Sequence, residues 1–337
     1  MRRSAERGAR TGTHLFAPLG RTSTVTDLVT VGEATLRFSP QRGDRIETAG
    51  EFAAHVGGPE SNVAAAAATL GLDAVWLSKL PETALGRRIV GDLRRHGVRT
   101  GVVWTDDGRA STAFVERGGT AGATTVADRD GAAVETMTED DVPLGVVRDA
   151  DTLFVSGATP ARSETLLETT EWLLKAAGEA GTTRAFDTRF VKTGLDPDTA
   201  RELYDRLLDD VEVLIVDEAD ADAVYGLDGD VVPTGHSLRT RYDCGTVVVT
   251  RADSSHAVVG LAGESIYEVP PFEAETRDPA GVHDAFVGGF LAGCHRGRDM
   301  RDALYDGAAT AALKRTLVGD AVVGSRRDVG AIREREK

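Results

Sequence analysis

The chain contains little cysteine and no long apolar run. Cys244 and Cys294 are the only cysteines among 337 residues, and they lie too far apart to suggest a disulfide framework or a zinc site. A membrane-spanning helix needs about 18 or more consecutive apolar residues, and no such run is present. We therefore expect a protein of a reducing cytoplasm that makes no membrane contact.

Basic residues are outnumbered. The chain has 54 Asp and Glu against 39 Lys and Arg, which gives a formal charge of −15, and these charges are spread along the sequence. An evenly acidic surface repels phosphate backbones, so we expect no nucleic-acid partner.

Strand-like and helix-like segments alternate along most of the chain. Short apolar, β-branched runs predict buried strands, and the longer segments between them predict helices. This rhythm predicts an α/β fold with a mostly parallel sheet and helices on both of its faces. The predicted strands lie at 27–33, 74–77, 152–155, 211–216 and 246–250, and the predicted helices at 61–70, 85–96, 163–180 and 198–208.

Two regions break the rhythm. Residues 36–56 and 101–130 contain short alternating pieces separated by Gly and Asp clusters, which predict a small second sheet projecting from the main body. That sheet is either a lid or an edge extension used in subunit contacts. We expect residues 1–26 to be a disordered tail or an upstream start-site artefact, 27–325 to form one domain, and 326–337 to be a charged C-terminal tail.

The stretch DPAGVHDAFVGGF, residues 278–290, runs from a turn into a helix of small residues. Unpaired N–H groups in the first turn of a helix attract anions, and Gly281 would allow an anion to approach the backbone closely. Asp284 would lie in the same turn. It is either a helix cap or a base that accepts a proton beside a bound phosphoryl group.

This stretch and a second one carry a family resemblance. HVGGPESNVAAAAATLG, residues 55–71, is similar to the N-terminal signature of the ribokinase-like, or PfkB, carbohydrate kinases. DPAGVHDAF is similar to the C-terminal signature of the same family, which commonly reads DTTGAGDAF. The resemblance covers residues 27 to about 320 and implies a ribokinase-like fold with a β-sheet lid.

The resemblance also implies a reaction, the transfer of the ATP γ-phosphate to a sugar hydroxyl. Asp284 would be the base, and the backbone N–H groups of Gly281, Val282 and His283 would form an anion hole. The expected sugar-binding residues are Gly57, Gly58, Asn62, Arg129 and Asp284, and the expected nucleotide-binding residues are Thr250, Asp253 and Gly281.

Within the family the chain most resembles 2-keto-3-deoxygluconate kinases, because of Glu33 and the run Asp128-Arg129. Arg129 would bind the substrate carboxylate from the lid, or else be a solvated arginine in an acidic loop. Lid edges often pair in this family, which implies a dimer or higher homo-oligomer. The bias against Lys, with five in the chain, resembles proteins of salt-loving archaea.

The chain also departs from the family pattern. Asp217 and Asp220 replace the Asn and the Glu of the family's usual Asn-x-x-Glu motif. They could still hold hydrated Mg²⁺ indirectly, through water. Arg189 replaces the Asn of the Asp-x-Asn-x-Arg motif, and His283 replaces a glycine of the anion hole. We expect the hole to survive with the imidazole turned away from the phosphate.

These departures leave alternatives to a 2-keto-3-deoxygluconate kinase. One is a kinase for another sugar, such as fructose or a nucleoside. The other is a catalytically weakened protein of the same fold that binds or senses a sugar.

Overall fold

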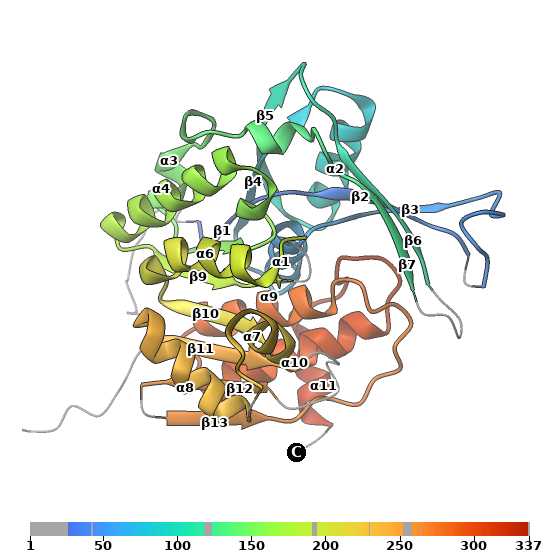
Figure 1. Ribbon diagram of the computed structural model, residues 1–337. Helices are drawn as coiled ribbons and strands as arrows, with labels where there is room; N and C mark the ends of the chain where they lie inside the picture. Colours follow the sequence, from blue (N-terminus) through green and yellow to red (C-terminus); the bar gives the residue numbers. More distant parts are fainter. Residues whose placement is uncertain are drawn as a thin grey trace, which may run out of the picture.

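The computed structural model describes residues 26–335 except 42, 118–122, 191–193, 229, 252–257 and 264. A nine-stranded sheet forms the centre of the fold, in the order β13-β12-β11-β10-β9-β8-β1-β4-β5 (Figure 1). The strands from β11 to β5 pair in parallel, and β12 alone runs in the opposite direction, pairing antiparallel with both β11 and β13. The strands are β1 Leu28–Val31, β4 Ala74–Pro81, β5 Arg99–Thr105, β8 Thr152–Ser156, β9 Thr183–Asp187, β10 Val213–Asp217, β11 Thr246–Thr250, β12 Val258–Ala262 and β13 Ser265–Val269.

Alternate strand residues face opposite sides of this sheet and enter two separate cores. Leu214 and Val216 of β10 belong to one core, while Val213 and Ile215 belong to the other. Because both faces are covered, β1, β4, β8, β10 and β11 read as continuous apolar runs, and this is why the sequence predicted these five strands correctly. The strands β9, β12 and β13 were not predicted. The expected α/β architecture is confirmed.

Helices cover both faces. Residues of α1 Pro59–Thr69, α2 Ala84–Arg95, α9 Val282–His295, α10 Met300–Arg315 and α11 Arg326–Glu334 line the first core. Residues of α3 Leu144–Arg148, α4 Glu164–Ala180, α6 Pro197–Leu207, α7 Glu218–Tyr225 and α8 Val231–Tyr242 line the second. Four short 3₁₀ turns complete the described elements, at Ala133–Thr136, Glu139–Asp141, Pro160–Arg162 and Leu208–Asp210.

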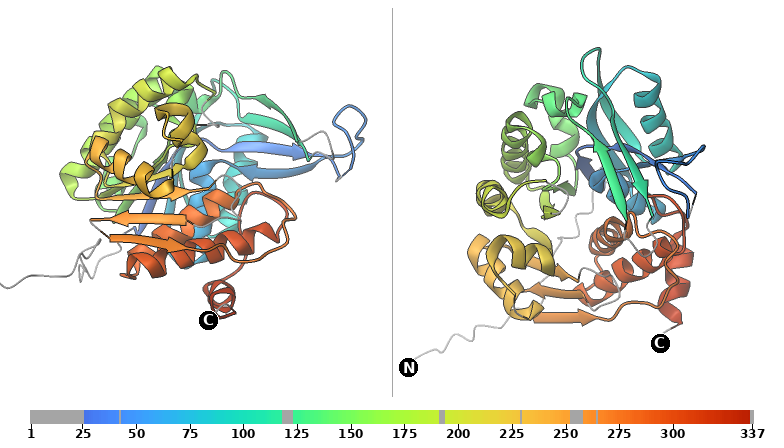
Figure 2. Two further views of the ribbon diagram at one scale, coloured as in Figure 1. Left: turned by 60° about the horizontal axis from the view of Figure 1, so that its bottom comes forward. Right: turned by 45° about the vertical axis from the view of Figure 1, so that its right-hand side comes forward.

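A four-stranded sheet in the order β3-β2-β6-β7 projects from the main body (Figures 1 and 2). It consists of β2 Thr35–Ser39, β3 Ala53–Gly57, β6 Ser111–Glu116 and β7 Thr124–Asp128. We call these strands the lid sheet. The lid was predicted to include residues from 101 onward, but β5 pairs with β4 in the main sheet, so the second lid segment begins at Ser111.

Both ends of the chain bear on the predictions. Of the tail predicted at 1–26, only Thr26 lies among the described residues. The predicted charged tail at 326–337 instead contains α11, whose Arg333 forms ion pairs with Asp302 and Asp306 of α10. Of the helices described, none has the length and apolar character needed to cross a bilayer.

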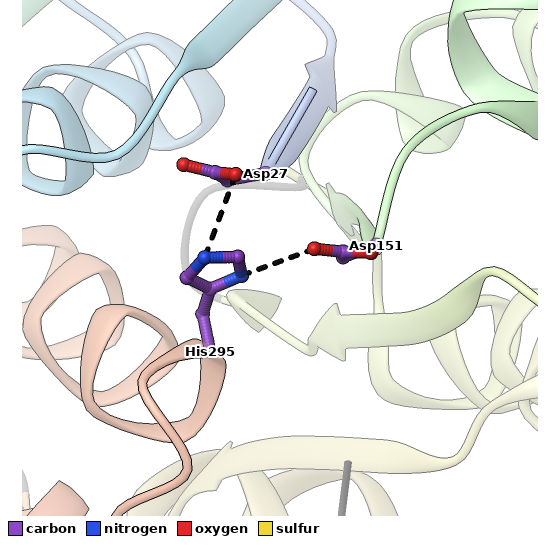
Figure 3. Close-up of side chains that lie close together, drawn as sticks. All are labelled: Asp27, Asp151 and His295. Carbon is purple, nitrogen blue, oxygen red and sulfur yellow. Dashed lines mark ion pairs between the residues drawn. The ribbon is translucent and has the colours of Figure 1, made fainter. Parts of the chain in front are cut away.

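Helix α9 runs along the main sheet from the carboxyl ends of its strands to their amino ends. Its last residue, His295, lies between Asp27 and Asp151, with its ring nitrogens 3.4 Å and 3.3 Å from their carboxylate oxygens (Figure 3). Asp27 and Asp151 immediately precede β1 and β8, so this cluster marks the amino-terminal edge of the sheet. His295 follows Asp284, in the first turn of α9, by eleven positions, a distance of roughly 16 Å at 1.5 Å per residue.

Candidate active site

The first turn of α9 has the geometry that the motif predicted. Gly281 is the N-cap residue with φ 72°, and a side chain there would collide with the carbonyl oxygen of Asp320. Only glycine fits this combination of left-handed backbone and close contact. The helix begins at Val282 and Asp284 lies in its first turn, only 3% exposed. The predicted anion-hole residues and the predicted base therefore lie together at the start of α9.

Asp284 joins the two signatures. Asn62 of α1 donates a hydrogen bond from Nδ2 to Asp284 Oδ2 over 2.7 Å. Arg189 approaches the other oxygen, with Nη2 3.3 Å from Oδ1, near enough for an ion pair but not aligned as a hydrogen bond. The carboxylate is thus held between an amide and a cation and is not a solvent-exposed helix cap.

Three consecutive parallel strands end beside this turn. Asp187, Asp217 and Thr250 are the last residues of β9, β10 and β11, and Asp217 pairs with Thr250 in register. The carboxyl edge of a parallel sheet is where ligands bind in open α/β folds. A pocket of about 130 Å³ opens there, lined by Arg189, Asp217, Thr250, Arg251, Pro271, Phe272, Val282, His283, Phe286, Ala308, Ala311, Ala312 and Arg315.

His283 makes a contact that sequence reasoning missed. Its Nε2 lies 2.8 Å from Oδ2 of Asp187, the last residue of β9. Burial opposes protonation of the imidazole, but the Asp187 and Asp284 carboxylates together outweigh it, and the pKa of His283 is raised. The ring is therefore fixed on a carboxylate, although it still lines the pocket.

Asp217 and Asp220 have different surroundings. Asp217 caps α7 by accepting from the Ala219 N–H over 3.0 Å, and its other oxygen accepts from Thr250 Oγ1 over 3.2 Å. One oxygen of Asp220 accepts from both Thr188 Oγ1 and the Phe190 N–H, at 2.8 Å and 2.9 Å. Burial raises the pKa of both carboxyl groups. Asp220 thus holds the turn after β9.

These carboxylates fit a hydrated magnesium ion in charge and ligand type. Mg²⁺ prefers oxygen ligands and keeps several of its waters. Asp187 Oδ1 is buried without a hydrogen-bond partner in the described part of the chain, and Asp217 lines the pocket. Asp217 is the better placed of the two predicted residues, because it lines the pocket and Asp220 does not.

Arg129 faces a protein carboxylate in the structure. Its Nε donates to Glu33 Oε2 over 3.0 Å, and Ser111 Oγ also donates to Glu33. The Arg129 side chain is 21% exposed, so the alternative of a solvated loop arginine is wrong. Burial opposes the charge on Arg129, but Glu33 keeps its pKa above the ordinary value. Its predicted role toward a substrate carboxylate stays a prediction.

Three other predicted residues need separate comment. At Gly58, a side chain would collide with the Glu33 carbonyl oxygen, and at Gly57 a Cβ would lie 2.5 Å from Asp320 Oδ1. The turn therefore packs against the segment between β1 and β2 and against the loop after α10. Asp253 lies outside the described residues.

Glu60, in the same signature as Asn62, is fully buried. Its Oε1 accepts hydrogen bonds from Ser156 N–H, Ser156 Oγ and Thr159 Oγ1 at 2.9, 2.7 and 2.8 Å. Burial raises the pKa of this carboxyl group from 4.5 to about 7. Between these two values the folded chain holds a proton that the unfolded chain has released, so stability falls as the pH rises through that window.

Replacing Glu60 with Gln should remove this pH dependence, because the amide keeps the acceptor oxygen without a charge. At about pH 8 we expect the variant to be more stable to urea by on the order of 2 kcal/mol. Below about pH 4.5 both proteins should be equally stable, since the wild-type carboxyl is then neutral in both states. A variant that is less stable at the higher pH would contradict the assignment.

Comparisons with known proteins agree with this geometry. The profile described as pfkB family carbohydrate kinase matches residues 25–323. A 2-dehydro-3-deoxygalactonokinase of Haloferax volcanii is 46% identical over 298 residues, covering 88% of this chain and 93% of the relative. The solved 2-dehydro-3-deoxygluconokinase of Thermotoga maritima is 28% identical with a TM-score of 0.86, covering 92% and 98%. A fructokinase of Xylella fastidiosa with bound ATP, 21% identical with a TM-score of 0.81 over 93% and 99%, shares the fold.

A buried carboxylate in a helix first turn at the carboxyl edge of a parallel sheet suits phosphoryl transfer to a hydroxyl, and the profile match extends over almost all of the described chain. The class of protein is thus a sugar kinase. The chain belongs to the PfkB family of carbohydrate kinases. The Haloferax relative also agrees with the haloarchaeal character expected from the composition.

Proposed function

We propose that this kinase transfers the γ-phosphate of ATP to a hydroxyl of a 2-dehydro-3-deoxy sugar acid, with 2-keto-3-deoxygluconate or its C4 epimer, the galactonate, as substrate. The observation that carries the reaction is the contact of Asn62 with Asp284, which joins the two signatures at one carboxylate. The sugar class is supported by the names of the relatives, which include both epimers.

The proposed reaction uses the two sides of Asp284. The carboxylate accepts the proton of the sugar hydroxyl while the hydroxyl oxygen forms a bond to the γ-phosphorus and the bond to the ADP oxygen breaks. Asn62 fixes the orientation of Asp284, and the N–H groups at the start of α9 stabilise the charge on the phosphoryl oxygens.

Asp217, with Asp187 beside it, would hold the hydrated magnesium ion at the nucleotide side of the pocket. When bound, the ion would neutralise charge on the phosphates. Thr250 and Arg251 line the same pocket and would contact the nucleotide.

The test is an ADP-release assay in molar KCl. The substrates are both C4 epimers of the sugar acid, with fructose and adenosine as neutral comparisons, and phosphorus NMR would identify the hydroxyl that is phosphorylated. We expect turnover with at least one sugar acid and little with the neutral compounds. A preference for fructose or adenosine would refute the substrate assignment.

A catalytically weakened sugar-binding protein is the second candidate, favoured by the engagement of Asp220 in the turn after β9. Sugar binding in calorimetry with no ADP release on any substrate would support it.

We also propose that the lid sheet mediates a homo-oligomer. All five residues of its edge strand β7 are exposed, including Val126 at 53%. A mass measured by light scattering that equals one chain would exclude it.

A further inference from the structure

Arg189 has an unusual backbone conformation. Its φ is 46°, a left-handed value that residues with a Cβ rarely adopt. The flanking residues are held in place by Asp220, one oxygen of which accepts from Thr188 Oγ1 and from the Phe190 N–H. A strained residue persists only where its surroundings fix it, and such residues concentrate at functional sites.

This turn directs a guanidinium to the reacting centre. Arg189 Nη2 lies 3.3 Å from Asp284 Oδ1 in a contact that is not aligned as a hydrogen bond. Its Nε is buried and has no hydrogen-bond partner in the described part of the chain. Arg189 also lines the pocket together with Asp217 and Thr250. The side chain therefore has donors that the protein itself does not use.

The contacts of Asp284 separate two sides of the site. Asn62, from the signature that resembles a sugar-binding turn, occupies Oδ2. Arg189 occupies Oδ1 and belongs to the pocket formed by the ends of β10 and β11. The guanidinium thus lies on the nucleotide side of the base, where the phosphoryl group must pass.

We propose that Arg189 is a catalytic residue that binds the oxygens of the phosphoryl group in flight, an inference that rests on the kinase function proposed above. As the acceptor oxygen bonds to phosphorus and the ADP oxygen leaves, the planar fork of donors binds two phosphoryl oxygens. When the guanidinium binds these oxygens it leaves Asp284 Oδ1, and that oxygen takes the proton of the hydroxyl.

The test is Arg189→Gly, which deletes the guanidinium and relieves the left-handed strain in one change. We expect kcat to fall about a hundredfold and the KM for the sugar acid to stay nearly constant. The melting temperature should fall, because the buried Asp284 carboxylate loses its cation and the relief of strain offsets only part of that loss. Arg189→Lys keeps the charge but loses the planar fork, so it should recover part of the lost kcat.

Asp243→Gly is the matched control. Asp243 is the other described residue besides glycine with positive φ, 50°, and it lies exposed at the end of α8. Its replacement should relieve the same kind of strain without changing kcat.

Two results would overturn the role of Arg189 alone. One is a wild-type kcat in Arg189→Gly. The other is a raised KM for sugar acids with unchanged kcat, which would mean that Arg189 binds the substrate carboxylate. A wild-type protein without turnover on any sugar would overturn both this role and the proposed function.

Discussion

Replacing Asp284 with Asn should lower kcat by about a thousandfold, with little change in the melting temperature. The amide has the same shape and can still bind Asn62, but it cannot accept the hydroxyl proton, and general-base catalysis contributes roughly 10²–10⁴-fold. The loss should appear in kcat rather than in the KM for the sugar, because the missing interaction belongs to the transition state. Steady-state ADP release in molar KCl measures both constants.

A helix-cap role for Asp284 predicts a different result. Asp198 lies in the first turn of α6 and is exposed, so Asp198→Asn removes a helix-terminus charge without touching the site. We expect that variant to keep wild-type turnover. If both variants lost similar stability and neither lost activity, Asp284 would be a cap and another base would be needed.

The main body could be predicted because its signals are local. Strands buried on both faces are apolar throughout, and Gly281 marks a position that only glycine can occupy. Helix α11 was missed because it is rich in charge and buries only Val329, and it is held by the ion pairs of Arg333. The local sequence of a charged segment does not predict which helix its arginine will contact.

The site was predicted in part for the same reason. The position of Asp284 follows from the motif, but its partner Arg189 depends on a left-handed turn, and Thr188-Arg189-Phe190 contains none of the residues that usually favour one. The contact of His283 with Asp187 joins residues 96 positions apart and depends on the packing of α9 against the sheet edge. One available signal was overlooked, a lone arginine within the apolar alternation of β2, Arg37.

Arg37 leads to a buried charge network between the lid sheet and the loop before α9. Arg37 of β2 donates to Asp278 Oδ2 over 3.1 Å and to Asp320 Oδ2 over 2.8 Å, and Arg117, just after β6, forms an ion pair with Asp278. Lys314 of α10 is fully buried and donates to the Asp278 carbonyl oxygen over 3.4 Å. Asp278 is therefore the centre of the network.

The backbone depends on Asp278 as well. Its carboxylate accepts from the N–H groups of Ala280 and Gly319, at 3.2 Å and 2.9 Å. Ala280 directly precedes the N-cap Gly281 of α9, and Gly319 precedes Asp320, whose carbonyl oxygen packs against Gly281. The lid strands and the anion-hole loop are thus joined through one side chain.

Replacing Asp278 with Ala should destabilise the fold by about 3–5 kcal/mol, because the buried Arg37 and Lys314 and the half-buried Arg117 are left with Asp320 as their remaining carboxylate. Asp278→Asn keeps the shape of the side chain and removes only its charge. This variant should show most of the destabilisation expected for Asp278→Ala. The exposed pair Arg45 and Glu47 gives the control, and Glu47→Ala should leave the free energy of unfolding nearly unchanged. Urea unfolding in molar KCl measures all three.

The pH dependence gives an independent check on the same residue. Burial would raise the pKa of Asp278, but Arg37, the Gly319 and Ala280 N–H groups and Arg117 together hold it below the ordinary value of 3.8. A carboxyl group with a depressed pKa stabilises the fold at pH values above its pKa in the unfolded chain. This stabilisation is lost as the pH falls through its pKa in the folded chain. Asp278→Asn should therefore lose less stability than the wild type below about pH 4. Two results would contradict this role: equal acid sensitivity of Asp278→Asn and the wild type, or a destabilisation by Asp278→Asn of less than about 1 kcal/mol at neutral pH. Either result would mean that Asp278 contributes no more than a surface ion pair and that other contacts join the lid to the anion-hole loop.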